Sequence, residues 1–313
     1  MTPRPHRAMN ADWKRPATHV IDQASGLRAA VQAHSPRTQP VQVVAVSSGK
    51  GGVGKTNVVT NLAVACAKHG RKVLVMDADL ALGNVDILLG LAPSATIEDV
   101  LTGDRTLEEV IIKGPEGISI LPAASGIQEL SNLTYEQQLR LQAGFLQLSN
   151  PPDLLMIDCA AGISSNVLYF SLVAHDTLIV VSPEPGSLTD AYALIKILST
   201  RYHQQHFRLL VNMVRKPNEG REVFRKLSLV TDRFLNVSLD FVGWIPFDDC
   251  VPLAVSQQRP VLVAFPRAMA SRALSQVGEK IGKWTYDRHL RGGYQLFGSM
   301  GFGPIHEEMG KTA

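Results

Sequence analysis

The stretch VVAVSSGKGGVGKTNVVTNLAVACAKHG, at Val43 to Gly70, decides the fold of this chain. A short β-branched run leads into a glycine-rich loop, and an apolar-periodic segment with helical spacing follows. The loop GKGGVGKT, at Gly49 to Thr56, matches the phosphate-binding pattern G-x-x-x-x-G-K-[ST] in the strand, loop and helix context that this pattern requires. The sequence therefore predicts a nucleotide-binding α/β domain.

The loop supplies the chemistry for binding a nucleotide with its metal ion. Its glycines let backbone N–H groups turn towards phosphate oxygens, Lys55 can reach the outer phosphates, and the Thr56 hydroxyl can ligate Mg²⁺ at the start of the helix. We therefore expect ATP or ADP, with Mg²⁺, to bind at Gly49, Lys50, Gly51, Gly52, Val53, Gly54, Lys55, Thr56 and Asn57.

Short apolar runs continue beyond the loop, with helical stretches between most of them. They read RKVLVMD, ISIL, DLLMID, TLIVVS, FRLLVN and DFVGWI. Runs of this kind indicate parallel strands that helices cover on both faces. We predict an α/β domain over residues 41–285, with a doubly wound, mostly parallel sheet and helices on both faces.

The two ends of the chain differ in composition from this domain. Residues 1–40 are rich in Pro, Arg and Gln, which predicts a flexible N-terminal arm. Residues 286–313 include the glycine-rich segment RGGYQLFGSMGFGP, which we interpret as a separate C-terminal tail. No run approaches the roughly 18 apolar residues of a membrane span. The three cysteines lack metal-ligand spacing, and a reducing cytoplasm fits them best.

Charge is distributed unevenly along the chain, although its net charge is only +3. Basic residues exceed acidic ones in the arm and again from Arg259 to Arg291, whereas the body between them is acidic. This pattern suggests contacts with an anionic surface or partner, and a merely solvated tail is about equally consistent with it.

Lys50 is a second lysine in a loop whose own phosphate contacts Lys55 and the backbone already supply. The segment KGGVGKT, at Lys50 to Thr56, resembles the deviant Walker A ATPases, which include the MinD, ParA and nitrogenase iron protein groups. The resemblance implies a P-loop NTPase of the SIMIBI, MinD-like type. It also implies that Lys50 reaches the nucleotide of a second subunit, so that ATP holds a homodimer together.

The same resemblance assigns further residues to the site. It makes Asp79, in the switch segment DADLALGNVD, the residue that orients the attacking water in ATP hydrolysis. Asp77 and Asp158 end apolar runs and are expected to hold Mg²⁺ through water. Asn212 at the end of FRLLVN is expected to read adenine, and Pro246 and Phe247 in IPFDD to line the base. The expected catalytic residues are thus Lys50, Lys55 and Asp79.

Longer segments are similar to one branch of this family, the flagellar number regulators called FlhG or FleN. They include EPGSLTDAYALIKIL, EGREVFRKLSLVTDRFL, LPAASGIQEL, DCAAGIS and FVGWIPFDDCVPLAVSQQRPVLVAFPRAMASRAL. In the arm, IDQASGLR at Ile21 to Arg28 resembles a DQAxxLR motif that engages the SRP-type GTPase FlhF. The motif assigns partner binding to Asp22, Gln23, Leu27 and Arg28.

The resemblance also implies partners and a location. The expected partners are an FlhF-type GTPase, flagellar C-ring and switch proteins, a FleQ-type transcription activator in some bacteria, and the inner membrane surface. We therefore expect a cytoplasmic ATPase that regulates flagellar number and placement, with ATP-dependent peripheral membrane association and no direct nucleic-acid partner. Relatives often end in a membrane-targeting helix, and the tail offers only Leu290, Tyr294, Phe297 and Phe302 as an apolar stripe; its glycines make it a poor helix in water, so we expect weak membrane targeting.

Two rival classes stay open at this point, and a third is disfavoured. A ParA-like ATPase for DNA segregation and a MinD-like ATPase for septum placement share the loop. The ParA-like protein would bind nucleic acid through the basic segment that begins at Arg259. An iron–sulfur carrier requires a bridging pair such as CxxC, which the sequence lacks. The switch also departs from relatives by having Ala81 and Gly83 where they show Gly and then Ala, which predicts altered stiffness of this loop.

Overall fold

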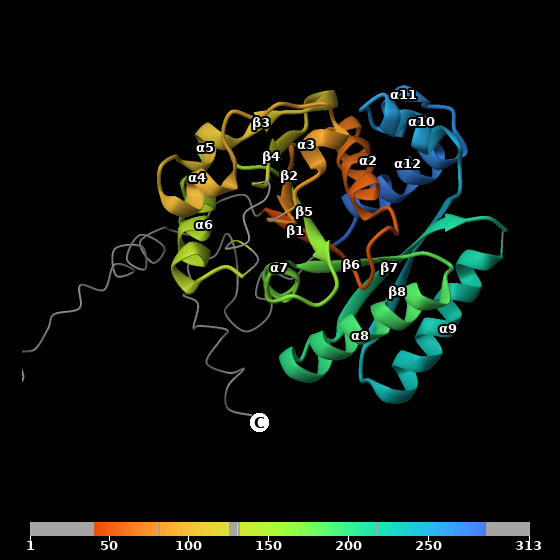
Figure 1. The fold of residues 1–313 in the computed structure, drawn as a ribbon. Coiled ribbons are helices and arrows are strands. Elements are labelled where there is room, and N and C mark those ends of the chain that lie inside the picture. Colours follow the sequence, from red (N-terminus) through yellow and green to blue (C-terminus); the bar gives the residue numbers. More distant parts are fainter. Residues whose placement is uncertain (1–40, 81, 125–129, 131, 217, 286–313) are drawn as a thin grey trace, which may run out of the picture.

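The computed structural model of the chain describes residues 41–80, 82–124, 130, 132–216 and 218–285 (Figure 1). The N-terminal arm with its partner motif, the C-terminal tail, Ala81 and part of LPAASGIQEL lie outside the described residues. No helix within the described ranges combines the length and apolar character that crossing a membrane demands.

Eight strands form a single sheet in the order β3-β4-β2-β5-β1-β6-β7-β8. Neighbouring strands run parallel, except for the antiparallel pair β3 and β4. The strands are β1 (Gln42–Ser48), β2 (Val73–Ala78), β3 (Ile112–Lys113), β4 (Ser119–Leu121), β5 (Leu154–Ala161), β6 (Asp176–Val181), β7 (His206–Val214) and β8 (Ser238–Pro246).

Helices lie on both faces of this sheet (Figure 1). One face carries α2 (Lys55–Lys68), α10 (Cys250–Ser256), α11 (Val261–Ala264) and α12 (Met269–Gly282). The other carries α4 (Ile97–Thr102), α5 (Leu107–Val110), α6 (Tyr135–Gln147), α7 (Ser165–Val173), α8 (Pro185–Tyr202) and α9 (Glu219–Phe234). The short elements α3 (Val85–Leu88) and η1 (Pro115–Gly117) complete the described fold.

Strand alternation explains why both faces are apolar. In β1, Val43 and Ala45 belong to the core beneath α6 to α9, whereas Val44 and Val46 belong to the core beneath α2 and α12. Successive side chains of a strand point to opposite faces, so a continuous β-branched run fills two cores at once. The apolar run before the loop is therefore a strand covered on both faces, as predicted.

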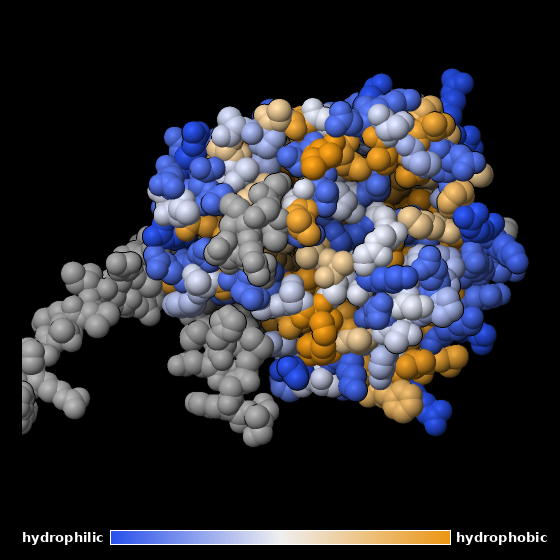
Figure 2. All heavy atoms as spheres, viewed as in Figure 1, coloured by the Kyte–Doolittle hydropathy of each residue, from blue (hydrophilic) through white to orange (hydrophobic). Residues whose placement is uncertain are grey.

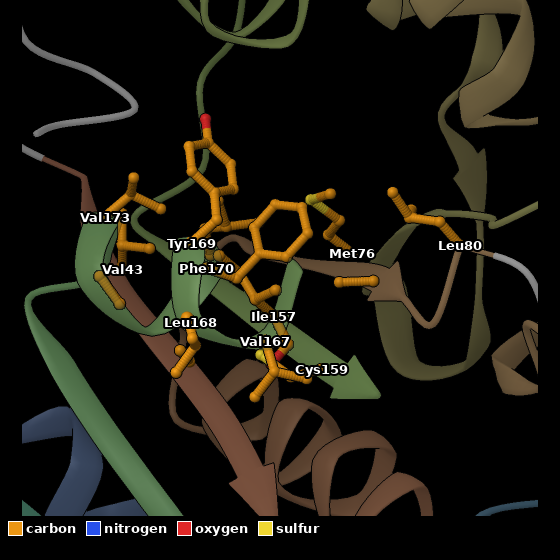
Figure 3. Close-up of a cluster of buried hydrophobic side chains, with 14 of the residues drawn as sticks. Val43, Met76, Leu80, Ile157, Cys159, Val167, Leu168, Tyr169, Phe170 and Val173 are labelled. Carbon is orange, nitrogen blue, oxygen red and sulfur yellow. The ribbon is translucent and has the colours of Figure 1, made fainter. Parts of the chain in front are cut away.

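Helix α7 brings two aromatic side chains onto the first of these cores (Figure 3). Tyr169 and Phe170 are buried and meet edge to face, with ring centroids 5.0 Å apart. Figure 3 shows them above Ile157 of β5 and beside Met76 of β2. Burying such rings contributes several kcal/mol each to the stability of the fold, which fixes the strands whose ends carry the polar residues of the candidate site.

The prediction of a doubly wound, mostly parallel α/β fold is confirmed. All seven runs that we interpreted as strands are strands, with ends that differ by at most three residues. The sequence analysis missed β3, which has only two residues and too short a pattern to read.

Candidate nucleotide-binding site

The polar residues predicted from the sequence gather at one edge of the sheet. Asp77 is the next-to-last residue of β2, Asp158 lies three residues before the end of β5, and Asn212 lies two residues before the end of β7. Asp77 and Asp158 are direct register partners of the parallel pair β2–β5. Because the carboxyl ends of parallel strands share an edge, all three lie around the loop that follows β1.

The loop itself depends on glycine at two kinds of position. Gly52 and Gly54 have φ of 82° and 79°, a left-handed conformation that side chains with a Cβ disfavour. Gly49 has another reason, because a Cβ there would come within 2.1 Å of the Asp190 carbonyl carbon in α8. The loop is therefore packed against α8 as well as turned back on itself.

Helix α2 begins at Lys55 directly after Gly54, and its first turn contains no acidic residue. The free N–H groups and the positive end of the helix dipole thus meet no carboxylate from the helix itself. Thr56, the second residue of α2, is partly exposed and places its hydroxyl at this end of the helix. This arrangement is suited to binding a phosphate group.

Lys55 contacts the strand-end acid predicted beside it. Its Nζ donates to Oδ1 of Asp158 over 2.5 Å, and the two side chains are only 10% and 2% exposed. Burial alone would lower the pKa of Lys55, but the charge of Asp158 and its hydrogen bond outweigh burial and raise that pKa. Lys55 therefore stays protonated, with its charge within the site.

Asp77 organises the segment that contains Asp79. One carboxylate oxygen accepts from the backbone N–H of Asp79 at 3.1 Å, and the other accepts from those of Asn84 and Val85 at 2.8 and 3.0 Å. Burial and the charge of Asp158 raise the pKa of Asp77 to about 7, although the three donors favour its ionised form.

Gly83 of the switch segment lies inside this arrangement. A Cβ at Gly83 would come within 2.5 Å of the Ala123 Cβ and 3.0 Å of a carboxylate oxygen of Asp77. The close approach of the switch segment to Ala123 thus requires glycine at position 83.

Lys50 contacts the residue that precedes α8. Its Nζ lies 2.9 Å from Oε2 of Glu184, and both side chains are exposed, at 45% and 66%. The hydrogen bond from Lys50 to Glu184, together with the charge of Glu184, raises the pKa of Lys50. Solvent screens exposed pairs of this kind, so the contact contributes little stability and is readily exchanged for another.

The residues expected near the base also come together. Asn212 is buried and donates from Nδ2 to the Val53 carbonyl in the loop at 2.9 Å. The Phe247 N–H donates to the Val214 carbonyl at 2.9 Å, so the segment after β8 adjoins the end of β7. The Arg215 guanidinium stacks 4.0 Å above the Phe247 ring.

Asp248, in the same IPFDD segment, contacts the first turns of two helices, α10 and α12. Its carboxylate accepts from the backbone N–H of Cys250 and of Ala270, both at 3.0 Å. These N–H donors outweigh a burial effect of opposite sign and lower the pKa of Asp248. The segment after β8 is thereby held in place beside Pro246 and Phe247.

Sequence reasoning missed three residues that contact the predicted ones, namely Glu184, Asp190 and Arg215. Glu184 and Asp190 lie in the quoted segment EPGSLTDAYALIKIL, so the pattern was visible but its contact with the loop was not.

Among described residues, no cluster of three or more His, Cys, Asp or Glu could hold a metal ion by itself. The oxygen donors at hand, Thr56 with two strand-end carboxylates, suit Mg²⁺ bound largely by phosphate and water.

Comparison with known proteins agrees with this geometry. The family model described as AAA domain matches residues 41–209. The chain is 49% identical over 258 residues to the antiactivator FleN of Pseudomonas aeruginosa, covering 82% of this chain and 92% of that protein. It is 31% identical over 235 residues to the flagellum site-determining protein YlxH of Helicobacter pylori, covering 75% and 79%.

A solved structure gives the same result at the level of the fold. The septum site-determining protein MinD of Pyrococcus horikoshii, complexed with Mg-ADP, superposes with a TM-score of 0.62 and 26% identity, over 78% of this chain and 97% of that one. The loop, the strand-end acids and these similarities agree, and the chain belongs to the FleN/FlhG branch of the MinD-like P-loop ATPases.

Proposed function

We propose that this chain is an ATP-gated dimerising switch that regulates flagellar number and placement. One observation carries the proposal: the loop holds two lysines in different environments. Lys55 is buried against Asp158, while Lys50 is exposed and forms an ion pair with the exposed Glu184. Because Lys50 is not buried in its own nucleotide site, its ammonium group can contact the nucleotide of another subunit.

Within one subunit, the roles follow from position. The loop from Gly49 to Asn57 binds the phosphates at the start of α2, and Lys55 neutralises their charge after leaving Asp158. Thr56, Asp158 and Asp77 would hold Mg²⁺, and the ion would supply positive charge that neutralises the phosphates. Asn212 reads adenine, and Pro246 and Phe247 line the base.

Asp79 lies in the segment that Asp77 holds through backbone N–H groups. In the proposed reaction, Asp79 orients a water that attacks the γ-phosphorus, the bond to the β,γ-bridging oxygen breaks, and ADP and phosphate are released. Positioning and charge neutralisation supply most of the rate of phosphoryl transfer, so no stronger base is required.

A second copy of the chain is the partner that the surface around the site supports. Leu82, Ile87 and Ile163 are 68%, 57% and 48% exposed, and they lie in the switch segment, in α3 and before α7. Figure 2 shows apolar side chains gathered on this face, including the region between α7 and α8. Exposed apolar groups close to a functional site are typical of a protein interface.

The flagellar role rests on similarity to proteins whose names state it, an antiactivator and a flagellum site-determining protein. We extend the proposal to an FlhF-type GTPase bound through the arm motif, to flagellar C-ring proteins and to a FleQ-type activator. The tails of an ATP-bound dimer would act together on the inner membrane, since two linked weak binders gain avidity by about 10²- to 10⁴-fold. DNA segregation and septum placement are the alternatives.

Flagellar counting tests the proposal against these alternatives. The gene is deleted in the source organism, and flagella per cell are counted by electron microscopy after complementation with wild type, Lys50→Ala or Lys72→Ala. We expect excess or misplaced flagella in the deletion strain, rescue by wild type and by the surface control Lys72→Ala, and none by Lys50→Ala. A normal flagellar pattern with filamentous or anucleate cells would instead favour septum placement or DNA segregation.

A further inference from the structure

A basic groove runs along the free edge of the sheet. Strand β8 ends the strand order and pairs only with β7 among the described strands. Beside it lies a groove of about 490 Å³, between the first turn of α9 and the outer side of α12. None of its lining residues belongs to the phosphate-binding loop.

One wall of the groove is a single side of α12. Arg272, Gln276 and Lys280 follow one another at intervals of four residues and all line the groove. Met269, one turn before Arg272, continues the row and is 63% exposed. From Met269 to Lys280 the helix extends about 16 Å at 1.5 Å per residue. An extended peptide of about five residues has the same length.

The floor is β8, whose backbone is bent at a bulge. The register shifts between Leu209 and Leu210 of β7, and Gly243 of β8 has a φ of 153°, a conformation that favours glycine. At this bend the Lys280 Nζ donates to the Val242 carbonyl at 2.7 Å. The edge therefore offers backbone groups next to a cationic side chain.

Two aromatic side chains, Phe241 and Trp244, add apolar surface to the floor. Trp244 lies against the first turn of α9, where a Cβ at Gly220 would come within 2.8 Å of the Trp244 Cβ. Because Gly220 has no side chain, Trp244 can pack against α9 beside the groove.

The charged residues that line the groove are all basic. Arg221, Arg272 and Lys280 line it, and none of the lining residues is acidic. Arg272 and Lys280 come from the basic segment that begins at Arg259, which the nucleotide site does not use. Grouped cations beside apolar surface attract an anionic ligand that also buries apolar side chains.

We propose that this groove binds a short acidic, extended peptide segment of a partner protein, which lies along β8. Side chains of an extended peptide alternate in direction. Carboxylates at alternate positions would therefore face α12 and meet Arg272 and Lys280. The side chains between them would face α9, where apolar groups pack on Phe241 and Trp244 and Arg221 adds positive charge. The peptide backbone pairs with edge groups of β8, as in other cases of strand addition.

The free strand edge favours a peptide over a nucleic acid. An edge strand presents N–H and C=O groups that another polypeptide backbone can pair with, and a sugar–phosphate chain cannot reproduce that pairing. The groove also supplies only three cations over its length, which limits the phosphate contacts that give nucleic-acid binding its affinity.

The test uses the full chain and a defined probe. A fluorescein-labelled hexapeptide of alternating Glu and Val is titrated at about 0.15 M salt and followed by fluorescence anisotropy. The same peptide with Gln in place of Glu reports binding without charge, and a fifteen-nucleotide oligothymidylate reports nucleic-acid binding. The variants are Arg272→Glu and Arg221→Glu, with Arg259→Glu as a matched charge reversal outside the groove.

We expect the acidic peptide to bind and the Gln peptide to bind at least tenfold more weakly. Arg272→Glu and Arg221→Glu should each raise the Kd about tenfold, whereas Arg259→Glu should change it less than twofold. Hydrogen exchange in residues 238–246 should slow when the acidic peptide is present. Unaltered thermal unfolding and basal ATPase activity of the variants would exclude misfolding.

Three outcomes would overturn the proposal. Equal binding by wild type and Arg272→Glu would place the peptide elsewhere. Tighter binding of oligothymidylate than of the acidic peptide, lost in the same variants, would make the groove a nucleic-acid site. Unchanged exchange in β8 with bound peptide would exclude strand addition. Pro246 borders both sites, but the variants change only Arg221 and Arg272, which the nucleotide site does not use, so the groove and the proposed function fail independently.

Discussion

The Nζ atom of Lys50 lies 2.9 Å from the carboxylate of Glu184 in the same chain, at the exposed rim of the phosphate-binding loop. Beneath it, Gly49 contacts the backbone of Asp190 in α8, the helix that begins directly after Glu184. The position of Lys50 is therefore coupled to α8 rather than to the phosphates beside Lys55. For Lys50 to serve a second subunit, it must exchange Glu184 for a new anionic partner.

Replacement of Asp79 tests its proposed role in hydrolysis. Asp79→Ala removes the side chain that orients water but keeps the backbone N–H that Asp77 accepts. We expect ATP binding within about twofold of wild type and phosphate release at least tenfold slower, because only positioning of the attacking water is lost. Asp86→Ala, in the following α3, serves as a matched control. Phosphate release at the wild-type rate in Asp79→Ala would exclude this role.

Asn212 is expected to select the base. Its amide lies at the loop, where it donates to the Val53 carbonyl, and in the proposed complex it also reads adenine. Asn212→Ala should weaken ATP binding by about 1–3 kcal/mol and reduce the preference for ATP over GTP. Calorimetric titration with both nucleotides measures the two effects. If Asn212→Ala binds ATP more weakly but keeps the wild-type ratio of ATP affinity to GTP affinity, Asn212 acts only through its contact with the loop and does not select the base.

Two glycines of α12 provide a matched pair for packing. A Cβ at Gly278 would come within 2.5 Å of the Ala65 Cβ of α2, whereas a Cβ at Gly282 meets nothing within 4 Å. Gly278→Ala should destabilise the fold by about 1–3 kcal/mol through overpacking. Gly282→Ala should be neutral or stabilising by up to about 1 kcal/mol, since alanine favours helix. Denaturant unfolding compares them, and equal destabilisation by both would contradict this packing.

Asp77 should make the stability of the unliganded chain depend on pH. Its pKa is about 7 when folded, because of burial and Asp158, and lies near the ordinary Asp value when unfolded. Between these values the folded state binds the extra proton, so the contribution of Asp77 to the free energy of unfolding falls as pH rises from about 4 to 7. Asp77→Asn should abolish this component, and the wild-type minus variant difference in unfolding free energy isolates it. A pH-independent difference would contradict the raised pKa.

The fold was largely predictable because each central strand is a local β-branched run that fills two cores. The loop at Gly49 was predictable for the same reason, since its motif is contiguous. Strand β3 was not, because two residues carry no period. The contact between Lys50 and Glu184 spans 134 residues of sequence and depends on where α8 begins, which no local pattern encodes.

The basic groove illustrates the same limit. The sequence showed an excess of Lys and Arg from Arg259 onwards, and an anionic surface or partner was inferred without a location. Only the placement of α12 beside β8 brings Arg272 and Lys280 next to Arg221 of α9. The sequence shows where the basic residues lie along the chain, whereas their arrangement on the surface depends on the tertiary structure.

The central claim is that ATP joins two copies of this chain through Lys50. It is tested most directly by measuring molar mass with light scattering on a sizing column, with ADP or ATP and Mg²⁺, for Asp79→Ala and for Asp79→Ala combined with Lys50→Ala. The account predicts a dimer only with ATP for Asp79→Ala, and a monomer under all conditions once Lys50 is also replaced, with ADP affinity nearly unchanged. An ATP-dependent dimer of the double variant would contradict it.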